Sequence, residues 1–486
     1  MSELNMLMDD SLIDSRIKGT WFKLENQKKM STASLTEIKE IALIKGLDVI
    51  SVTEIKFGSS TQVDAVLLET TVGNAIFPRN KVSEIEMYQR NIMPFKKRED
   101  FWRTVDWFVP PYISNGELRK TFNSAGVTPG NFEMFDEKTA QHQFDTVLSD
   151  LYTLSNIVPI TLQIFPESEA LSPHLPIIKE AIISFYSGMQ VVAIAALIPI
   201  IENLLKKIIG EDGKSLSIFD SVNRCIDMAC ANVLKLHING ADWIPLEYRE
   251  IEFLKVTNER IFILQSIRAW LLNSFYADDA RYDKYSGFNR HHFAHALSNI
   301  WQNKTNFFRS LGLLQALAFV ECFALQGSNI SIFNPEPDER SESFHAEIIS
   351  SLIAQKIKRE VTEKFQSENK LPFNVLASND GWLMHASILS EKMNEVIVAS
   401  LRDKGWQCFN FGDPIKEGEY VTVEAQRGDE RIKIALLYAC ATSNKIYKEL
   451  AKSCDYILFK GSPYYIEEFA RDVDKPVMPL NAWIAP

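Results

Sequence analysis

The sequence is poor in cysteine and has no paired-cysteine motif. Six cysteines occur among 486 residues, and none shows the CxxC or Cys/His spacing of a structural zinc site. All six stand in apolar segments, which is typical of reduced thiols in a protein interior. The sequence therefore predicts neither a disulfide framework nor a cysteine-based metal site.

The sequence also lacks a hydrophobic run long enough to cross a bilayer. The longest uninterrupted run, Val191 to Ile201, ends at Glu202 and is shorter than the about 20 apolar residues that a transmembrane helix needs. The first ten residues, MSELNMLMDD, lack the basic and then apolar layout of a secretory signal. These observations predict a cytoplasmic protein without membrane contact.

An excess of positive charge is missing as well. The formal net charge is −11, which argues against broad affinity for nucleic acids, because a phosphate-binding surface would have to be a local patch on an acidic protein. Acidic and basic side chains balance between residues 175 and 325. That segment is therefore the part of the chain where we expect such a patch.

The same segment is predicted to be an all-helical bundle. Apolar residues recur there at helical spacing in four stretches, and Pro199 is expected to kink the first of them. Helices of this length, joined by short connections, pack as a bundle. The four stretches are residues 175–210, 216–237, 247–275 and 289–325.

An arginine and three histidines gather where the fourth helix is expected to begin. Asn289 is a good N-cap, which would put Arg290 at the first helical position. His291 and His295 are four residues apart and share one face, and Arg309 is expected on the same polar face. Since the positive end of a helix attracts anions, a phosphate is the ligand that we expect to bind where this helix starts.

This pattern resembles the signature of the HEPN superfamily of metal-independent ribonucleases, in which a histidine follows an arginine after four to six intervening residues. Arg290, His291 and His295 match that signature. Residues 186–205 are similar to the first long helix of HEPN domains in bacterial defence-type proteins, and residues 311–325 are similar to the helix that closes their bundle. The resemblance covers about a third of the chain.

The resemblance implies RNA cleavage without a metal or other cofactor, through attack of the 2′-OH on the adjacent phosphate to give a 2′,3′-cyclic phosphate. Arg290 would neutralise charge on the phosphoryl oxygens, and His295 would act as general base or acid. His291 would bind or orient the phosphate, while Arg309 and Asn289 are further candidates for substrate binding. The resemblance also implies a homodimer with a composite cleft, and a toxin or antiphage effector controlled by a regulatory ligand or an antitoxin.

Other interpretations of these residues stay open at the level of sequence. In one, Arg290 pairs with an acid such as Asp283 at an exposed helix start, and the histidines lie at a subunit interface. In another, the bundle is a catalytically silent module for dimerisation and RNA binding. Zinc binding by His291 and His295 is disfavoured, because the glutamate of an HExxH motif and a third ligand are missing. Glu202 either lies near the cleft or only caps its helix or pairs with a nearby lysine.

Residues 1–170 are predicted to form a mixed α/β region to which the sequence assigns no chemistry. A capping box at residues 34–37 opens a short helix that ends at Gly46. Two strands, residues 47–57 and 62–71, are expected to follow. A loop-rich aromatic stretch then leads to the bundle.

Beyond a linker at residues 328–345, residues 346–486 are predicted to form a C-terminal α/β domain. A charged helix is followed by the order helix, strand, strand, strand, helix, strand, helix, strand. The first six of these later elements resemble the restriction-endonuclease-like core, whose nucleases hold a metal with an acid on one strand and an acidic-x-Lys on the next. Asp413 and Glu424 are candidate acids, but residues 432–437 carry no acidic-x-Lys. An inactive or recognition version is therefore favoured over a metal-dependent DNA nuclease.

The sequence thus predicts a multidomain α+β protein. A central all-α, HEPN-like bundle at residues 171–327 is flanked by the N-terminal α/β region and by the C-terminal α/β domain. The expected activity is that of a metal-independent endoribonuclease.

Overall fold

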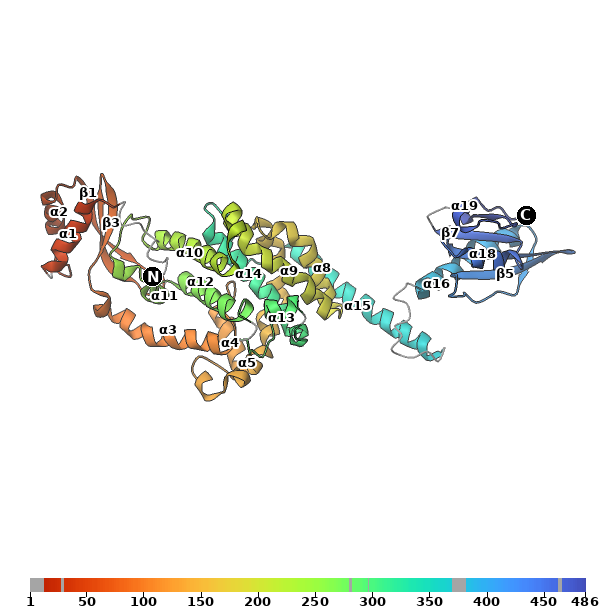
Figure 1. Cartoon of the computed structure of the whole chain (residues 1–486), viewed down its shortest axis with the longest axis horizontal. Coiled ribbons are helices and arrows are strands. Elements are labelled where there is room, and N and C mark those ends of the chain that lie inside the picture. The colour runs from red at the N-terminus through yellow and green to blue at the C-terminus, as the bar shows by residue number, and fades with distance from the viewer. Residues whose placement is uncertain (1–12, 28–29, 279–281, 296, 369–381, 462–465) are drawn as a thin grey trace. The chain divides into compact units, whose positions relative to one another are not determined.

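The computed structural model describes the chain in six ranges and divides it into two units, Met1–Ile353 and Ala354–Pro486. Both units mix helices with a small sheet, and helices predominate (Figure 1). Each unit is described by itself below. The described ranges are residues 13–27, 30–278, 282–295, 297–368, 382–461 and 466–486.

The first unit begins with two helices packed on an antiparallel sheet of order β1-β2-β3. The helix after the capping box and the first two strands confirm the prediction, because the cap and the alternating strand pattern are local signals. The third strand was not predicted. The elements are α1 (Ser15–Asn26), α2 (Leu35–Ile44), β1 (Val49–Phe57), β2 (Val63–Thr70) and β3 (Gly73–Pro78).

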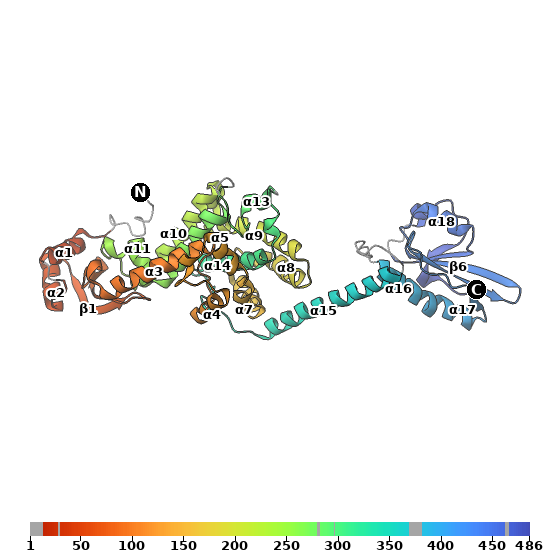
Figure 2. The same cartoon turned by 90° about the horizontal axis from the view of Figure 1, so that it is seen from below.

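A long helix leads from the sheet to a group of short helices (Figure 2). The long helix, α3, packs on α5, α11 and α12 along its length. It thereby joins the N-terminal sheet to the helices that follow it. The elements of this part are α3 (Glu86–Thr104), α4 (Asn115–Ala125), α5 (Glu137–Asp145), α6 (Leu148–Leu151) and α7 (Leu154–Pro159).

The remaining helices of the first unit pack mainly through α9, α10, α12 and α14. The first predicted helix is interrupted at Gly188, whose φ is 93°, and not at Pro199, which lies inside α9. Within the described residues α14 is the one helix long and apolar enough to span a membrane, and 94% of its apolar window is buried in the protein. These helices are α8 (Leu175–Tyr186), α9 (Gln190–Ile209), α10 (Ile218–His237), α11 (Ile251–Thr257), α12 (Glu259–Trp270), α13 (Arg290–Ala294) and α14 (Thr305–Ala324).

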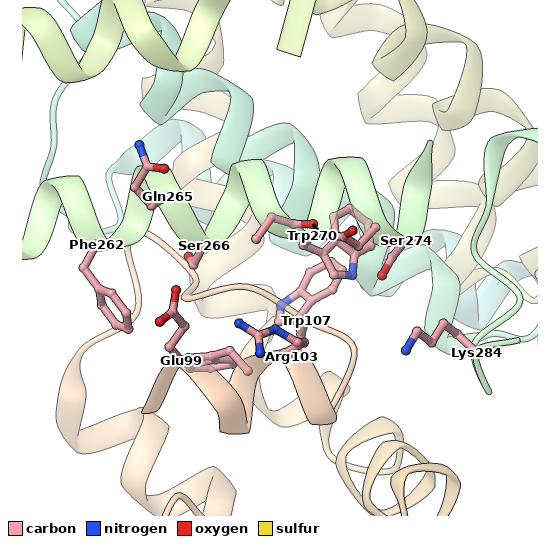
Figure 3. A pocket seen from close by; sticks show the side chains of 12 residues that line it. Glu99, Arg103, Trp107, Phe262, Gln265, Ser266, Trp270, Ser274 and Lys284 are labelled. Carbon is pink, nitrogen blue, oxygen red and sulfur yellow. Dashed lines mark hydrogen bonds between the residues drawn. The ribbon is translucent and has the colours of Figure 1, made fainter. Parts of the chain in front are cut away.

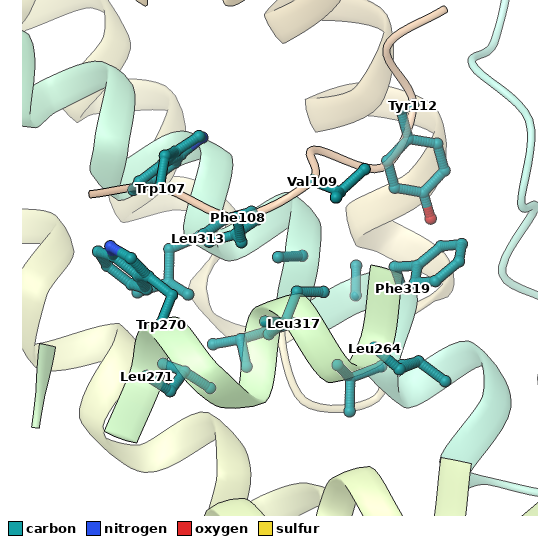
Figure 4. Packing of buried hydrophobic residues seen from close by; sticks show 14 of the residues in the cluster. Trp107, Phe108, Val109, Tyr112, Leu264, Trp270, Leu271, Leu313, Leu317 and Phe319 are labelled. Atoms are coloured by element: carbon teal, nitrogen blue, oxygen red, sulfur yellow. The ribbon is translucent and has the colours of Figure 1, made fainter. Parts of the chain in front are cut away.

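The predicted boundary near residue 170 is not a division of the structure. The segment from Trp107 to Tyr112 lies across α12 and α14, and its side chains pack against Leu264, Leu317 and Phe319 (Figure 4). One hydrophobic cluster contains these residues together with core residues of both predicted domains. The predicted separate domains therefore share one core, because the aromatic segment after α3 supplies apolar surface that the bundle helices bury.

The predicted linker also differs from the structure. Helix α15 (Glu339–Glu368) begins inside it, and Phe344 and Ile348 of this helix are buried in the core of the first unit. The division between the units falls after Ile353, within α15.

The second unit has a five-stranded sheet of order β4-β5-β6-β7-β8, antiparallel from β4 to β6 and parallel from β6 to β8. Helices α16 and α17 pack on one face and α18 on the other. The predicted order of elements is confirmed. They are α16 (Trp382–Lys392), α17 (Ala399–Asp403), β4 (Gln407–Phe409), β5 (Tyr420–Arg427), β6 (Glu430–Ala439), α18 (Asn444–Ala451), β7 (Tyr456–Gly461), α19 (Ile466–Phe469) and β8 (Val477–Pro479).

Candidate functional site

The helix that carries the Arg–His motif is much shorter than predicted. Helix α13 ends at Ala294, and α14 begins only at Thr305. Between them Ser298 accepts a hydrogen bond from the Ile300 N–H (3.1 Å), and Asn306, in the first turn of α14, donates from its side chain to the Trp301 carbonyl (3.0 Å). Such side chains compete with helical backbone bonds. The prediction of one helix over residues 289–325 was therefore wrong.

Asn289 caps α13, as predicted. Its Oδ1 accepts hydrogen bonds from the N–H groups of His291 (2.8 Å) and His292 (3.3 Å), and its Nδ2 donates to the carbonyls of Ser274 (2.9 Å) and Ala277 (3.0 Å). Because Asn289 takes up these two N–H groups, they are not open to a phosphate, contrary to the prediction. Asn289 is 2% exposed. It anchors the motif to the end of the preceding helix and is not placed to bind a substrate.

Arg290 pairs with Glu202 of α9. The Arg290 Nε donates to Glu202 Oε1 at 2.6 Å, and the two side chains are 37% and 35% exposed. The alternative partner Asp283 instead binds Lys138 at 2.9 Å. Within the described ranges the Nη groups of Arg290 make no hydrogen bond to the protein. Glu202 thus fixes the guanidinium by one edge and leaves its Nη groups for an anionic oxygen.

His291 and His295 lie on one face of α13, as predicted. Their rings are stacked, with centroids 6.0 Å apart and planes at 13°. The His291 side chain is half-buried and His295, the C-cap residue, is exposed. A single helical turn thus presents two imidazoles at the surface beside the Arg290–Glu202 pair.

Tyr276 lies beside this pair and was not predicted as a site residue. It is 2% exposed, and its hydroxyl makes no hydrogen bond within the described residues. Burial raises the pKa of Tyr276, the Glu202 carboxylate raises it further, and Arg290 opposes both effects. Tyr276 thus lies close enough to the ion pair for both of its charges to act on the buried hydroxyl.

A buried carboxylate, that of Asp106, holds the segment that precedes Arg290. Its oxygens accept hydrogen bonds from the hydroxyls of Ser274 (2.5 Å) and Ser286 (3.1 Å). Burial raises the pKa of Asp106, and the Arg309 charge opposes this effect. Asp106 has a φ of 54°, which an aspartate tolerates better than most residues. In the sequence, Asp106 is a single acid within an aromatic stretch. Nothing in that pattern shows that it binds Ser274 and Ser286.

Arg309 does not share a surface with the histidines, and this prediction was wrong. Its side chain is 1% exposed, forms an ion pair with Asp145, and places its Cζ 5.7 Å from the centre of the Trp107 ring. The prediction assumed one continuous helix, and the break after Ala294 removes the angular relation between Arg309 and the histidines. Arg309 is a core residue and not a phosphate contact.

The two candidate acids of the second unit lie in different surroundings. Asp413 is exposed in the segment before β5. Glu424 on β5 binds Arg431 (2.5 Å), Asn410 (3.2 Å) and Lys433 (3.4 Å), and these bonds, with that of Arg431 first, lower the pKa of Glu424. Over the described ranges, no three or more His, Cys, Asp or Glu side chains are grouped so that they could hold a metal ion. Glu424 therefore belongs to an ion-pair cluster.

Gly287 offers a stability test of this segment. Its φ is +61°, and a Cβ atom there would lie 2.6 Å from the Ile300 Cβ. We expect Gly287→Ala to lower the free energy of unfolding by about 1–3 kcal/mol, measured by urea denaturation, because of backbone strain and overpacking.

The matched control is Gly116→Ala, since Gly116 lies in the first turn of α4 and a Cβ atom there would lie 3.8 Å from Ser114 Oγ, which is an ordinary van der Waals contact. Alanine is expected to be neutral or stabilising there. Equal effects of the two substitutions would contradict the strained approach at Gly287.

The structure thus brings Arg290, Glu202, His291 and His295 together. Of the other predicted site residues, Asn289 lies beneath them and Arg309 in the core, while Asp413 and Glu424 belong to the second unit. No protein-family model, no curated protein and no solved structure matches this chain.

Proposed function

We propose that the chain is a metal-independent endoribonuclease of the HEPN type and that the helices of residues 171–327 correspond to a HEPN bundle. The observation that carries this proposal is the arrangement at α13. Glu202 holds the Arg290 guanidinium by its Nε, and two stacked imidazoles, His291 and His295, lie within one turn of it. This set combines a cation for a phosphate with groups that exchange protons near neutral pH.

In the proposed reaction His295 removes the proton from a ribose 2′-OH, and the 2′-oxygen forms a bond to the adjacent phosphorus. The bond from phosphorus to the 5′-oxygen breaks, and an imidazolium gives that oxygen a proton. The Nη groups of Arg290 stabilise the charge on the phosphoryl oxygens, and His291 orients the phosphate. The products are a 2′,3′-cyclic phosphate and a 5′-OH.

Glu202 is proposed as a positioning residue. Its bond to Nε leaves the Nη groups for the phosphate and limits the rotation of a long side chain. The same ion pair also favours a second candidate, a catalytically silent module that binds RNA, since a paired arginine carries less net charge toward a substrate.

The assembly and cellular role belong to the same proposal. A homodimer would join two copies of the motif, so that one imidazole acts as base and another as acid. The chain would serve as a cytoplasmic toxin or antiphage effector under the control of a ligand or an antitoxin. The second unit would be an inactive or recognition version of a restriction-endonuclease-like domain that senses that ligand or positions the target.

The test is cleavage of a labelled structured RNA in the presence of EDTA by the wild type, Arg290→Ala and His295→Ala. We expect cleavage that survives chelation, leaves a cyclic-phosphate end and falls by roughly a hundredfold or more in each variant. Arg224→Ala and His345→Ala are controls, because both remove exposed side chains of other helices, α10 and α15. Their activity should equal that of the wild type.

Equal cleavage by all variants would show that the site is wrong. A folded dimer that binds RNA and leaves it intact would support the silent module. Nicking of DNA that needs Mg²⁺ and is lost in Asp413→Ala or Glu424→Ala would support a nuclease in the second unit.

A further inference from the structure

A cavity of about 440 Å³ lies between α3, α4 and the segment after α4. Its lining contains two arginines, two asparagines and a threonine, but no aspartate or glutamate, in a chain whose net charge is −11. The lining therefore carries two positive charges and no negative charge on an acidic protein. The lining residues are Arg98, Trp102, Asn115, Leu118, Arg119, Phe122, Asn123, Thr128 and Pro129.

Arg98 is a half-buried cation that packs against two aromatic rings. Its Cζ lies 5.5 Å from the centre of the Phe95 ring and 5.3 Å from that of Phe262. Within the described ranges its guanidinium forms no ion pair and no hydrogen bond, and Glu259 acts on it only at longer range. Burial lowers the pKa of Arg98. The two rings hold the guanidinium in place but do not satisfy its N–H donors.

Helix α4 presents a row of donors to the same cavity. Asn115, Arg119 and Asn123 are spaced four residues apart, which puts them on one face of the helix. Arg119 is exposed and forms no ion pair within the described ranges. Leu118 and Phe122, which lie next to this row, supply apolar lining.

A second cavity, which Trp102 also lines, differs from the first in the pairing of its cations. Figure 3 shows Glu99 and Arg103 of α3 on the same side of α12 as Ser266, which lines this cavity with them. Every cation of this smaller cavity, of about 60 Å³, is already paired with an acid. The pairs are Arg103 with Asp100 and Lys284 with Glu137.

We propose that the cavity between α3 and α4 binds a small organic phosphate of about the size of a nucleoside monophosphate. The lining combines two arginines from two different helices, α3 and α4, with two asparagines, and guanidinium and amide N–H groups are donors that phosphate oxygens accept. The volume falls in the range of small-molecule pockets and exceeds what a phosphate ion fills. The apolar lining by Trp102, Leu118 and Phe122 receives the flat body of the ligand. This proposal stands independently of the endoribonuclease proposal.

The test is isothermal titration calorimetry of the full chain with AMP, adenosine, inorganic phosphate and benzoate. We expect AMP to bind more tightly than each of the other three. Arg98→Ala and Arg119→Ala should each raise the Kd for AMP by roughly tenfold or more. Lys120→Ala is the matched control, because it removes the same charge from the residue next to Arg119 and does not line the cavity.

Arg119 is exposed, so its variant is expected to fold even where Arg98→Ala does not, and circular dichroism checks this. A folded Arg119→Ala protein with unchanged AMP affinity would overturn the proposal, as would absence of AMP binding. An equal loss of AMP affinity in Lys120→Ala would also overturn the proposal, because it would show that only the net positive charge of this region matters. If benzoate bound as tightly as AMP, the proposal that the cavity prefers a phosphate to a carboxylate would be overturned.

Discussion

Replacement of Asp145 by alanine is expected to lower the free energy of unfolding by about 3–5 kcal/mol, because it leaves the Arg309 charge buried without its partner. The two side chains are 6% and 1% exposed and form an ion pair under the Trp107 ring. The Nε of Arg309 already lacks a hydrogen-bond partner within the described residues. Urea denaturation of the wild type and the variant measures the loss.

Two further variants test whether charge causes this loss. Asp145→Asn keeps an acceptor and should lose less stability than Asp145→Ala. The double variant Asp145→Leu with Arg309→Met removes both charges and should recover most of the stability of the wild type, as apolar replacements of buried ion pairs do. A double variant that is less stable than Asp145→Ala would contradict this account.

A fall in stability between about pH 7 and about pH 5 is the second expected result. His237 is 7% exposed, and burial lowers its pKa to about 4. The unfolded chain binds a proton at this residue below its usual pKa of 6.5, whereas the folded chain does not. The stabilisation by neutral His237 is therefore present above pH 6.5 and is lost as the pH falls toward 4, by about 2 kcal/mol at about pH 5.

The pH dependence is measured by urea denaturation of the wild type, His237→Gln and His345→Gln at several pH values. His237→Gln is expected to be less stable near neutral pH, because it loses the bond between Nδ1 and the Asn258 side chain (3.0 Å), but to show a shallower fall with acid. His345→Gln replaces an exposed histidine of the same unit and controls for the substitution. Parallel pH curves for wild type and His237→Gln would refute the assignment.

The second unit shows what local patterns predict well. Its helices and strands follow each other in the expected order, because the apolar residues alternate in β5 and form a continuous buried run in β6, while glycines or polar residues separate the elements. The sheet order was not predicted as such, since pairing depends on contacts between segments far apart in the sequence. Strand β3 was also not predicted, although its pairing with β2 across a short turn is local.

The first unit shows where such patterns fail. The apolar spacing continues from Phe293 through Ile300 to Phe307, but Ile300 packs over Gly287 and Phe293 against Trp301 in a non-helical segment. Asn306 bonds the Ser286 carbonyl at 2.8 Å and helps to hold this loop. These contacts join residues that helical periodicity alone does not place together. Because one continuous helix was predicted, Arg309 was expected on the surface, whereas it lies in the core.

Of the candidate site, the sequence predicted the residues of one short segment and named Glu202, but it missed Asp106 and Tyr276. Asn289, Arg290, His291 and His295 are neighbours in the chain, so a motif can find them. Asp106 and Tyr276 reach the site only through the fold, and no spacing in the sequence connects them to it. Glu202 was named as a candidate, but its pairing with Arg290 depends on how α9 packs.

The contacts of Asp106 and Asp145 have a consequence for synthesis of the chain. The partner of Asp145, Arg309, is synthesised 164 residues after it. The partners of Asp106, Ser274 and Ser286, are synthesised 168 and 180 residues after it. At ribosomal rates this delay lasts roughly 10–35 s. During that time Trp107 and Phe108 have no partner from α12 or α14. A nascent chain stalled before α12 should therefore bind holdase chaperones, and release should follow the emergence of α14 from the ribosome.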